Sequence, residues 1–485
     1  MPKKKRESMS SVDVAWLRMD RPSNLMVICG VLVLRERITI AALRSTVASR
    51  FLRFPRFRQR PALAIAGYQW ETDEHFDLAR HVRKVALARG AGDAGLEALM
   101  SRLVSTPLDP RHPLWQFDLV ANYKSGSAVA LRIHHCYADG IALIQVLLSM
   151  TDVDGSGRRA GPEPPPQRRG DAEDDPLAQL LEPLSGVLAS ASKAGATLLE
   201  KGAELWRDPA KAVALAEQGG AFTSEVAKLA LMNEDSPTRF KGKPRVAKRV
   251  AWADPIALDE VKVIGRALGC SVNDVLLSSV AGALRAYLVR RGDPVSGVMI
   301  RALVPVNLRR PEQAHRLGNK FGLVFLDLPI GIENPVERLY AVRANMRSLK
   351  GSYQPIIALG ILALMGVGPL ALQEQLLAML AKNATAVMTN VPGPQQALYF
   401  AGGKIDRLMF WVPQSGDIGM GVSIMTYAGD VQFGLIVDRS LCPDPEHVIE
   451  RFGPEFEKLV LCTLLAPWPW QQAPSAEAIE RLALA

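Results

Sequence analysis

The chain has 485 residues, of which 48% are apolar and 22% charged. This is enough apolar sequence to bury a large core, and it excludes a chain that is disordered throughout; at about 100–200 residues per domain we expect two or three domains. The 58 Lys and Arg residues outnumber the 49 Asp and Glu, so the net charge of +9 favours an anionic partner such as a phosphate-bearing substrate, an acidic membrane or nucleic acid.

The basic N-terminus, residues 2–6, resembles a nuclear localisation signal, but such a short tail is more often solvated or drawn to acidic lipid. The residues after it are too polar for the apolar segment of a secretory signal. The five cysteines are odd in number and widely spaced, which excludes a disulfide scaffold and a paired-cysteine zinc or redox site. We therefore expect an intracellular protein.

Residues 10–150 mix two hydrophobic patterns. Apolar runs typical of strands occur over 27–34 and 129–133, and helical spacing predicts helices over 40–52 and 95–103. Such mixing indicates an α/β or α+β domain.

A change of composition separates this part from the rest of the chain. Residues 155–176 combine Gly, Pro and both signs of charge, which is typical of an exposed linker, and the Ala- and Leu-rich residues 177–233 predict a helical connector. The chain thus divides into an N-terminal half (1–154), a linker and connector (155–244) and a C-terminal half (245–485).

The mixed pattern returns in the C-terminal half. We expect helices over 255–268 and 272–290. Strands are expected over 298–305, 322–328, 422–427 and 431–437. The two halves therefore resemble each other in character, without a repeat of fixed period.

Residues 355–372 carry no charged side chain and would span about 27 Å as a helix, at the lower limit for crossing a bilayer. Glycines and prolines interrupt this run at five positions. A buried helix, or one that lies on a membrane face, is therefore favoured over a spanning one.

The most informative segment is 128–140, where a predicted strand leads into His134 and His135 and then into Asp139 and Gly140, ahead of an apolar helix. Asp139 stands where a helix N-cap belongs, and Gly140 would let the chain turn sharply into the helix. Adjacent histidines at a strand end point to opposite sides, so they cannot easily bind one metal together. We expect one ring to face inward and the other to face a cleft.

An imidazole titrates near neutral pH and can take a proton from an alcohol or an amine. If the activated oxygen or nitrogen then attacks a thioester, no second base is needed. The segment therefore favours a one-base acyltransferase, and the alternative is a packed histidine pair beside an ordinary helix cap.

The run over residues 134–140, HHCYADG, fits the HHxxxDG motif of the chloramphenicol-acetyltransferase-like superfamily of CoA- and carrier-dependent acyltransferases, which includes condensation domains of peptide synthetases. More closely, the chain resembles the bacterial wax ester synthase/diacylglycerol acyltransferase family, through short stretches that occur in order. These are Ser11-Val12-Asp13 with Trp16-Leu17, Phe76-Asp77-Leu78 with His81-Val82, Pro113-Leu114-Trp115, Asn273-Asp274, Pro305-Val306-Asn307-Leu308-Arg309, Gly318-Asn319, and Thr389-Asn390-Val391-Pro392-Gly393-Pro394.

The resemblance implies an α/β fold of two chloramphenicol-acetyltransferase-like domains, each a mixed sheet with helices, with the channel at their interface. It also implies that His135 is the general base, that His134 supports it, and that Asp139 is structural and holds the loop that Gly140 completes.

The same resemblance gives substrate-binding candidates in both halves. Asn273, beside Asp274, could orient the alcohol or donate to the oxyanion, with helix capping as the alternative. The stretch Pro113-Leu114-Trp115 shapes an alkyl pocket or packs the domain. Asn390 begins a rigid turn, 390–394, that either lines the channel or is a plain loop.

The expected reaction joins a fatty acyl group from acyl-CoA to a long-chain alcohol or a diacylglycerol in a ternary complex, with no metal and no bound cofactor. The apolar run 355–372 could line the alkyl tunnel or dip into lipid. Candidates for the CoA phosphates are Arg301, Arg309, Arg310 and Lys320, unless these form a solvated face. Cys136 is rejected as an acyl carrier, since the family pattern leaves its position variable.

We expect a cytoplasmic monomer or homodimer attached peripherally to the inner membrane or to lipid inclusions. One alternative is a condensation-type enzyme that uses carrier-bound thioesters, and another is a non-catalytic lipid-droplet or membrane surface protein. A nucleic-acid partner is not expected, because the basic residues are dispersed and form no recognised module.

Overall fold

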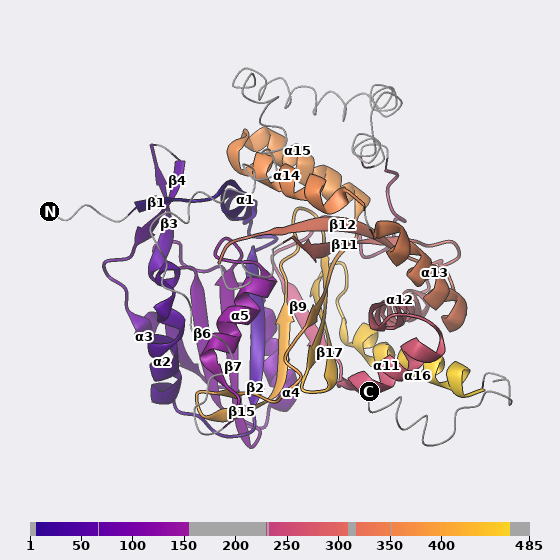
Figure 1. Cartoon of the computed structure of the whole chain (residues 1–485), viewed down its shortest axis with the longest axis horizontal. Helices are drawn as coiled ribbons and strands as arrows, with labels where there is room; N and C mark the ends of the chain where they lie inside the picture. The colour runs from indigo at the N-terminus through magenta and orange to yellow at the C-terminus, as the bar shows by residue number, and fades with distance from the viewer. Residues whose placement is uncertain are drawn as a thin grey trace.

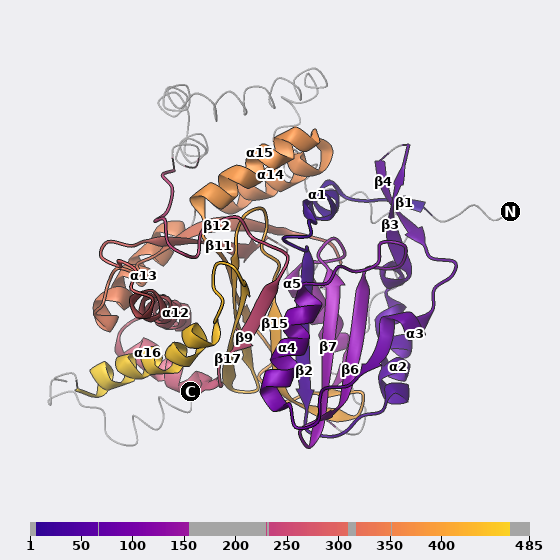
Figure 2. The same ribbon diagram turned by 180° about the vertical axis from the view of Figure 1, so that it is seen from behind.

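The structure is a computed structural model that describes residues 6–65, 67–154, 229, 232–308, 317–350 and 352–465. The predicted linker and nearly all of the predicted helical connector lie outside these residues. In Figures 1 and 2 the N-terminal half, in indigo to magenta, lies beside the C-terminal half.

A seven-stranded mixed sheet of order β5-β6-β7-β2-β15-β14-β8 forms the N-terminal half. Its strands are β2 (Val27–Leu34), β5 (Val82–Val85), β6 (Trp115–Tyr123), β7 (Gly126–His134), β8 (Thr151–Asp152), β14 (Tyr399–Phe400) and β15 (Gly403–Trp411). A small separate sheet joins β1 (Arg6–Ser8), β3 (Gln59–Ala64) and β4 (Gly67–Thr72).

Helices cover both faces of this sheet, which is why β2 is almost continuously apolar. Leu32 and Leu34 pack with α2 (Ile40–Ser49) and α5 (Gly140–Met150) on one face. Cys29 and Val31 pack with α4 (Gly92–Val104) on the other face. Figure 2 shows α4 on that side of the sheet. The remaining helical segments of this half are α1 (Ser11–Met19), α3 (Leu78–His81) and the 3-10 turns Phe51–Arg53 and Pro55–Arg58.

The C-terminal sheet has the order β10-β17-β16-β13-β11-β12, with β9 also paired to β17. Its strands are β9 (Lys248–Trp252), β10 (Ile256–Ala257), β11 (Ile300–Asn307), β12 (Phe321–Leu328), β13 (Ala386–Pro392), β16 (Met420–Tyr427) and β17 (Asp430–Asp438). Its helices are α11 (Leu258–Ala267), α12 (Val272–Arg290), α13 (Pro335–Leu349), α14 (Gln354–Val367), α15 (Leu370–Asn383) and α16 (Glu446–Leu465).

Two strands of the C-terminal half, β14 and β15, belong to the N-terminal sheet. β15 pairs with β2 in antiparallel register, with Trp411 opposite Cys29, and β14 pairs with β8. The boundaries of the two halves stay a prediction, but residues 399–411 cross from one half into the sheet of the other.

Several predicted elements occur where the patterns placed them. The strand over 27–34 and the helix over 272–290 agree to the residue. The turn predicted to begin at Asn390 is wrong, because β13 continues to Pro392 and the chain turns only from Gly393. Parallel pairing to β16 holds this segment extended.

The apolar run 355–372 forms α14 and the start of α15, broken at Gly368 and Pro369. Within the described ranges, one helix is long and apolar enough to cross a bilayer, and this is α12, most of which is buried in the core. Helix α14 packs closely on α1 and β12, as two glycines show. A Cβ added to Gly366 of α14 would lie 1.7 Å from the carbonyl oxygen of Ser11 in α1. A Cβ added to Gly322 of β12 would lie 1.9 Å from the carbonyl oxygen of Pro355 in α14.

Candidate active site

The two histidines lie where β7 ends, and their backbones are fixed to the neighbouring strands. The N–H of His134 donates to the carbonyl of Leu114 (2.9 Å), just before β6. The N–H of His135 donates to the carbonyl of Met26 (2.7 Å), just before β2. The loop is therefore held by the start of both strands that flank β7.

The two rings have different surroundings. His134 accepts the N–H of Cys136 at Nδ1 (3.1 Å). The ring of His135 stacks on Trp16 of α1, with 4.0 Å between centroids, and lies 5.7 Å from the ring of Phe321. Only 2% of His134 and 5% of His135 are exposed, so neither ring faces open solvent. The expectation that one of them faces a cleft stays a prediction.

Burial controls the charge of His135. Loss of hydration, with a smaller effect of the neighbouring His134, lowers its pKa from 6.5 to about 3, and hydrogen bonding only partly opposes this shift. Its Nδ1 is buried without a hydrogen-bond partner among the described residues. The imidazole is therefore neutral at physiological pH, which is the form that accepts a proton.

Asp139 is the N-cap of α5, as its position in the sequence predicts. One carboxylate oxygen accepts the N–H of Ala142 (2.9 Å), and the other accepts the N–H of Lys320 (3.0 Å) from the C-terminal half. The N–H of Asp139 donates to the carbonyl of Gly318 (3.2 Å). The carboxylate thus fastens the histidine loop to the segment that precedes β12.

Gly140 does not provide the sharp turn that the sequence suggested. It is the first residue of α5, its φ is not positive, and an added Cβ would meet no atom within 4 Å. The chain turns at the N-cap instead, and the missing side chain leaves open space beside the loop.

Two residues that sequence reasoning gave no role stand beside His135. The side-chain amide of Asn319 donates to the carbonyl of His135 (2.9 Å) and to Asp13 of α1 (2.8 Å). Burial raises the pKa of Asp13 to about 6, against the hydrogen bonds from Asn319 and Ser10. Both residues lie in stretches that carried the family resemblance, which was the available signal.

Pro113-Leu114-Trp115 lies behind the histidine loop. The N–H of Leu114 donates to the hydroxyl of Tyr137 (3.0 Å). Trp115 is buried, donates from its indole to the carbonyl of Phe57 (2.7 Å), and stacks on His81. These contacts pack the domain, and a role in substrate binding stays a prediction.

The structure brings together Asn273 and Asn390, which lie far apart in the sequence. The amide of Asn390 in β13 donates to the side-chain carbonyl of Asn273 in α12 (2.7 Å). Asn273 does not cap this helix, because Ser271 and Asp274 form a reciprocal capping box there. Their roles toward substrate stay predictions.

The CoA-phosphate candidates are only partly described, since Arg309 and Arg310 lie outside the described residues. The guanidinium of Arg301 is held by Asp327 (2.7 Å) and by the carbonyl of Asn233 (2.7 Å). Burial raises the pKa of the Cys136 thiol well above its usual value, so this side chain is not a thiolate nucleophile. No cluster of three or more metal-ligating side chains occurs in the described part of the chain.

Two mixed sheets joined by an exchanged strand, with a histidine pair at the end of a central strand, define an acyltransferase of the chloramphenicol-acetyltransferase-like class. Two family models match: the wax ester synthase/diacylglycerol acyltransferase catalytic domain at residues 9–276, and the WS/DGAT C-terminal domain at 317–460. The chain belongs to the wax ester synthase/diacylglycerol acyltransferase family, and it is an acyltransferase.

Similar proteins of known sequence or structure support this assignment. A Mycobacterium tuberculosis protein named as a diacylglycerol O-acyltransferase is 29% identical over 446 residues, covering 88% of this chain and 83% of the relative. The wax ester synthase/diacylglycerol acyltransferase from Marinobacter aquaeolei VT8 has the same fold, with a TM-score of 0.68, 20% identity, and coverage of 95% and 100% of the two chains. The starter condensation domain of rhizomide synthetase also shares the fold, with a TM-score of 0.58, 14% identity and 95% coverage of each chain.

Proposed function

We propose that the protein transfers a fatty acyl group from acyl-CoA to a long-chain alcohol or a diacylglycerol, with His135 as the general base. The observation that carries this proposal is the environment of His135, a neutral imidazole on a loop fastened from both halves of the chain. The relatives named as diacylglycerol O-acyltransferases support the acceptor class.

In the proposed mechanism, the imidazole of His135 takes the proton of the acceptor hydroxyl. The oxygen attacks the thioester carbonyl, and the tetrahedral intermediate expels the CoA thiolate as the ester forms. The proton then passes from the imidazolium to the sulfur, so that free CoA leaves and the base is restored.

The low pKa of the buried ring is compatible with this role. Burial keeps His135 unprotonated before substrate binds. The negative charge that develops on the acyl oxygen favours the protonated imidazole, because an opposite charge nearby stabilises the charged form. The basicity of the ring therefore rises along the reaction.

We also propose that the protein works at a lipid surface in the cytoplasm, as a monomer or a homodimer and without a bound cofactor. Exposed apolar side chains support the lipid contact: Val367 and Leu370 at the α14–α15 turn, and Leu63 and Ile65 at the β3–β4 turn. In Figures 1 and 2 both hairpins lie at the upper side of the molecule. Flotation with anionic lipid vesicles tests this contact, and protein that stays in the unbound fraction contradicts it.

The test of the reaction is the release of CoA thiol from palmitoyl-CoA, measured with hexadecanol, with a diacylglycerol and without an acceptor. The proposal predicts that release requires an acceptor and that the matching ester accumulates. Folded protein that releases no thiol with either acceptor would overturn it.

A second candidate is transfer from a carrier-bound thioester, which the fold shared with condensation domains keeps as the alternative. The two candidates are distinguished by measuring ester formation with the same acceptors and with palmitoyl thioester bound either to CoA or to a carrier protein. Turnover of the carrier-bound donor alone would move the assignment to this candidate.

A further inference from the structure

Two buried polar atoms on residues that contact each other have no hydrogen-bond partner among the described residues. They are Nδ1 of His135 and the side-chain oxygen, Oδ1, of Asn319. The contact between the two residues is made elsewhere, because the amide nitrogen of Asn319 donates to the backbone carbonyl of His135 (2.9 Å). A buried polar atom without a partner costs free energy. The two atoms satisfy each other if Nδ1 carries the proton of the ring.

The orientation of the Asn319 amide follows from its neighbours. Its nitrogen lies 2.8 Å from Oδ1 of Asp13 and 2.9 Å from the carbonyl oxygen of His135. Burial raises the pKa of Asp13 to about 6, so at neutral pH its carboxylate is ionised and both neighbours are acceptors. Only the nitrogen of the amide can donate to them, which excludes an exchange of its nitrogen and oxygen. The oxygen is left to accept from a further group.

The ring of His135 is held in place next to this amide. Trp16 stacks on the ring with 4.0 Å between centroids, and the ring of Phe321 lies 5.7 Å away. Burial lowers the pKa of His135, and hydrogen bonding from the Asn319 side chain partly opposes this shift. An acceptor oxygen favours the protonated ring, whereas a donor opposes it. The sign of this effect therefore indicates that the amide oxygen acts on the ring.

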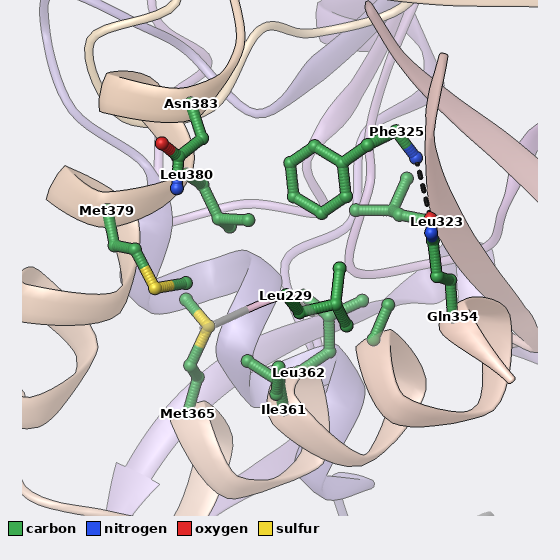
Figure 3. A pocket seen from close by; sticks show the side chains of 11 residues that line it. Leu229, Leu323, Phe325, Gln354, Ile361, Leu362, Met365, Met379, Leu380 and Asn383 are labelled. Carbon is green, nitrogen blue, oxygen red and sulfur yellow. Dashed lines mark hydrogen bonds between the residues drawn. The ribbon is translucent and has the colours of Figure 1, made fainter. Parts of the chain in front are cut away.

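The residues that hold the amide belong to anchored elements. Asp13 lies in the first turn of α1, where its N–H donates to the hydroxyl of Ser10 (3.2 Å). Asn319 precedes β12, and the N–H of Phe325 in that strand donates to the side-chain carbonyl of Gln354 in α14 (3.0 Å), as Figure 3 shows. Helix α14 in turn packs on α1. A base that must be positioned accurately requires such rigid support.

We propose that Asn319 is the positioning residue of the base: its side-chain oxygen accepts the proton of Nδ1 of His135, and Asp13 holds its amide in this orientation. A neutral imidazole carries one proton. With that proton on Nδ1, Nε2 is the atom that takes the proton of the acceptor hydroxyl. Such hydrogen bonds are often long before substrate binds and shorten in the complex. The inference rests on the proposed function, because it names the reacting atom of the general base.

Nitrogen NMR of protein with isotope-labelled histidines tests the proposal, because the shifts of the two ring nitrogens report which of them carries the proton. The chain has seven histidines, and His135→Ala identifies the signals of this ring. At neutral pH we expect a proton on Nδ1 and none on Nε2. In Asn319→Ala this single form should give way to a mixture of both. A proton on Nε2 in the wild type, or an unchanged spectrum in Asn319→Ala, overturns the proposal.

This measurement needs no turnover, so its failure and the failure of the proposed function are distinguishable. A protein that carries the proton on Nδ1 but transfers no acyl group contradicts the proposed function and leaves the role of Asn319 standing. A protein that transfers acyl groups with the proton on Nε2 contradicts the inference alone.

The kinetics give a second test. Asn319→Ala should lower kcat by about 10²-fold, the cost of a reacting group displaced by about 1 Å, and should leave KM for palmitoyl-CoA unchanged, because Asn319 contacts the base. Asn345→Ala is the matched control: this amide also donates to a backbone carbonyl, that of Asp327 (2.8 Å), but not at the base. The control should keep the wild-type kcat. A folded Asn319→Ala protein with wild-type kcat overturns the proposal.

Asp13 should act only through Asn319. Asp13→Ala leaves the amide free to turn and should lower kcat, whereas Asp13→Asn keeps an acceptor oxygen and should retain most of the activity. In a protein that already carries Asn319→Ala, Asp13→Ala should cause no further loss. If Asn319→Ala does not fold, the comparison of Asp13→Ala with Asp13→Asn is the test. Equal losses in these two variants, or additive losses in the double variant, contradict the role of Asp13.

Discussion

At the scale of single residues, the ring of His135 is both buried and unprotonated. It is nearly inaccessible beneath Trp16, and its pKa is lowered to about 3, so it is unprotonated but weakly basic before substrate arrives. A hydroxyl that reaches this ring meets a base that needs no prior deprotonation.

This environment predicts the pH dependence of the reaction. A solvated histidine would lose activity as pH falls through about 6.5. For His135 we expect kcat/KM to stay flat through that range and its acid limb to lie below about pH 5. A profile of kcat/KM for acyl transfer between about pH 4 and 8 measures this, and a half-maximal point near 6.5 would contradict the buried ring.

Asp13 predicts a pH dependence of stability. Its pKa in the folded protein, about 6, lies above the unfolded value of 3.8 because of burial. The stabilisation linked to this group is therefore fully present below about pH 3.8 and is lost as pH rises through about 6. As pH rises from about 3.8 to above 6, the free energy of unfolding of the wild type should fall relative to that of Asp13→Asn. Urea unfolding at several pH values checks this, and parallel pH curves for the two proteins would refute it.

The sequence pointed to His134, His135 and Asp139 because their roles depend on local features, a strand end and an N-cap. It did not give Asn319 or Asp13 a role at His135, because their contacts join segments more than a hundred residues apart. Hydrogen bonds of this kind leave no periodic pattern along the chain.

At the scale of elements, α14 packs on the two elements whose aromatic rings contact His135. It packs on α1, which carries Trp16, and on β12, which carries Phe321. Glycine at 366 permits this close packing, because the Ser11 carbonyl occupies the space of a side chain.

The close contact predicts the effect of Gly366→Ala. The added methyl group must push α14 and α1 apart, which we expect to cost about 1–3 kcal/mol. Gly140→Ala is the matched control, since its Cβ meets no atom within 4 Å, and it should leave stability unchanged or slightly raised. Denaturant unfolding of both variants measures this, and equal stability would show that α14 is not packed on α1 as described.

Elements with a strong local pattern were predictable, such as β2 and α12. β15 was not predicted, and its place in the N-terminal sheet depends on pairing with a strand that lies far away in the sequence. The apolar run 355–372 was recognised, but its division into α14 and α15 depends on Pro369 at the N-cap of α15.

At the scale of the whole molecule, the exchanged strand makes the two halves depend on each other. β15 covers an edge of β2 that would otherwise expose unpaired N–H and C=O groups beside apolar side chains. Asp139 and Asn319 join the halves a second time, at the site itself.

This interdependence predicts that residues 1–154 do not fold alone. Without β15 the fragment presents the open edge of β2, which favours pairing between copies. Size-exclusion chromatography should find aggregates or no soluble protein. A monodisperse, folded monomer would show that the N-terminal sheet does not need the exchanged strand.

The central claim is that His135 is the base, and the most direct measurement is acceptor-dependent thiol release from palmitoyl-CoA by the wild type, His135→Ala and His134→Ala. We predict that His135→Ala lowers kcat by about 10²–10⁴, the usual effect of a positioned base, while palmitoyl-CoA still binds. His134→Ala should lose less, because this ring holds the loop. A folded His135→Ala protein with wild-type turnover would contradict the account.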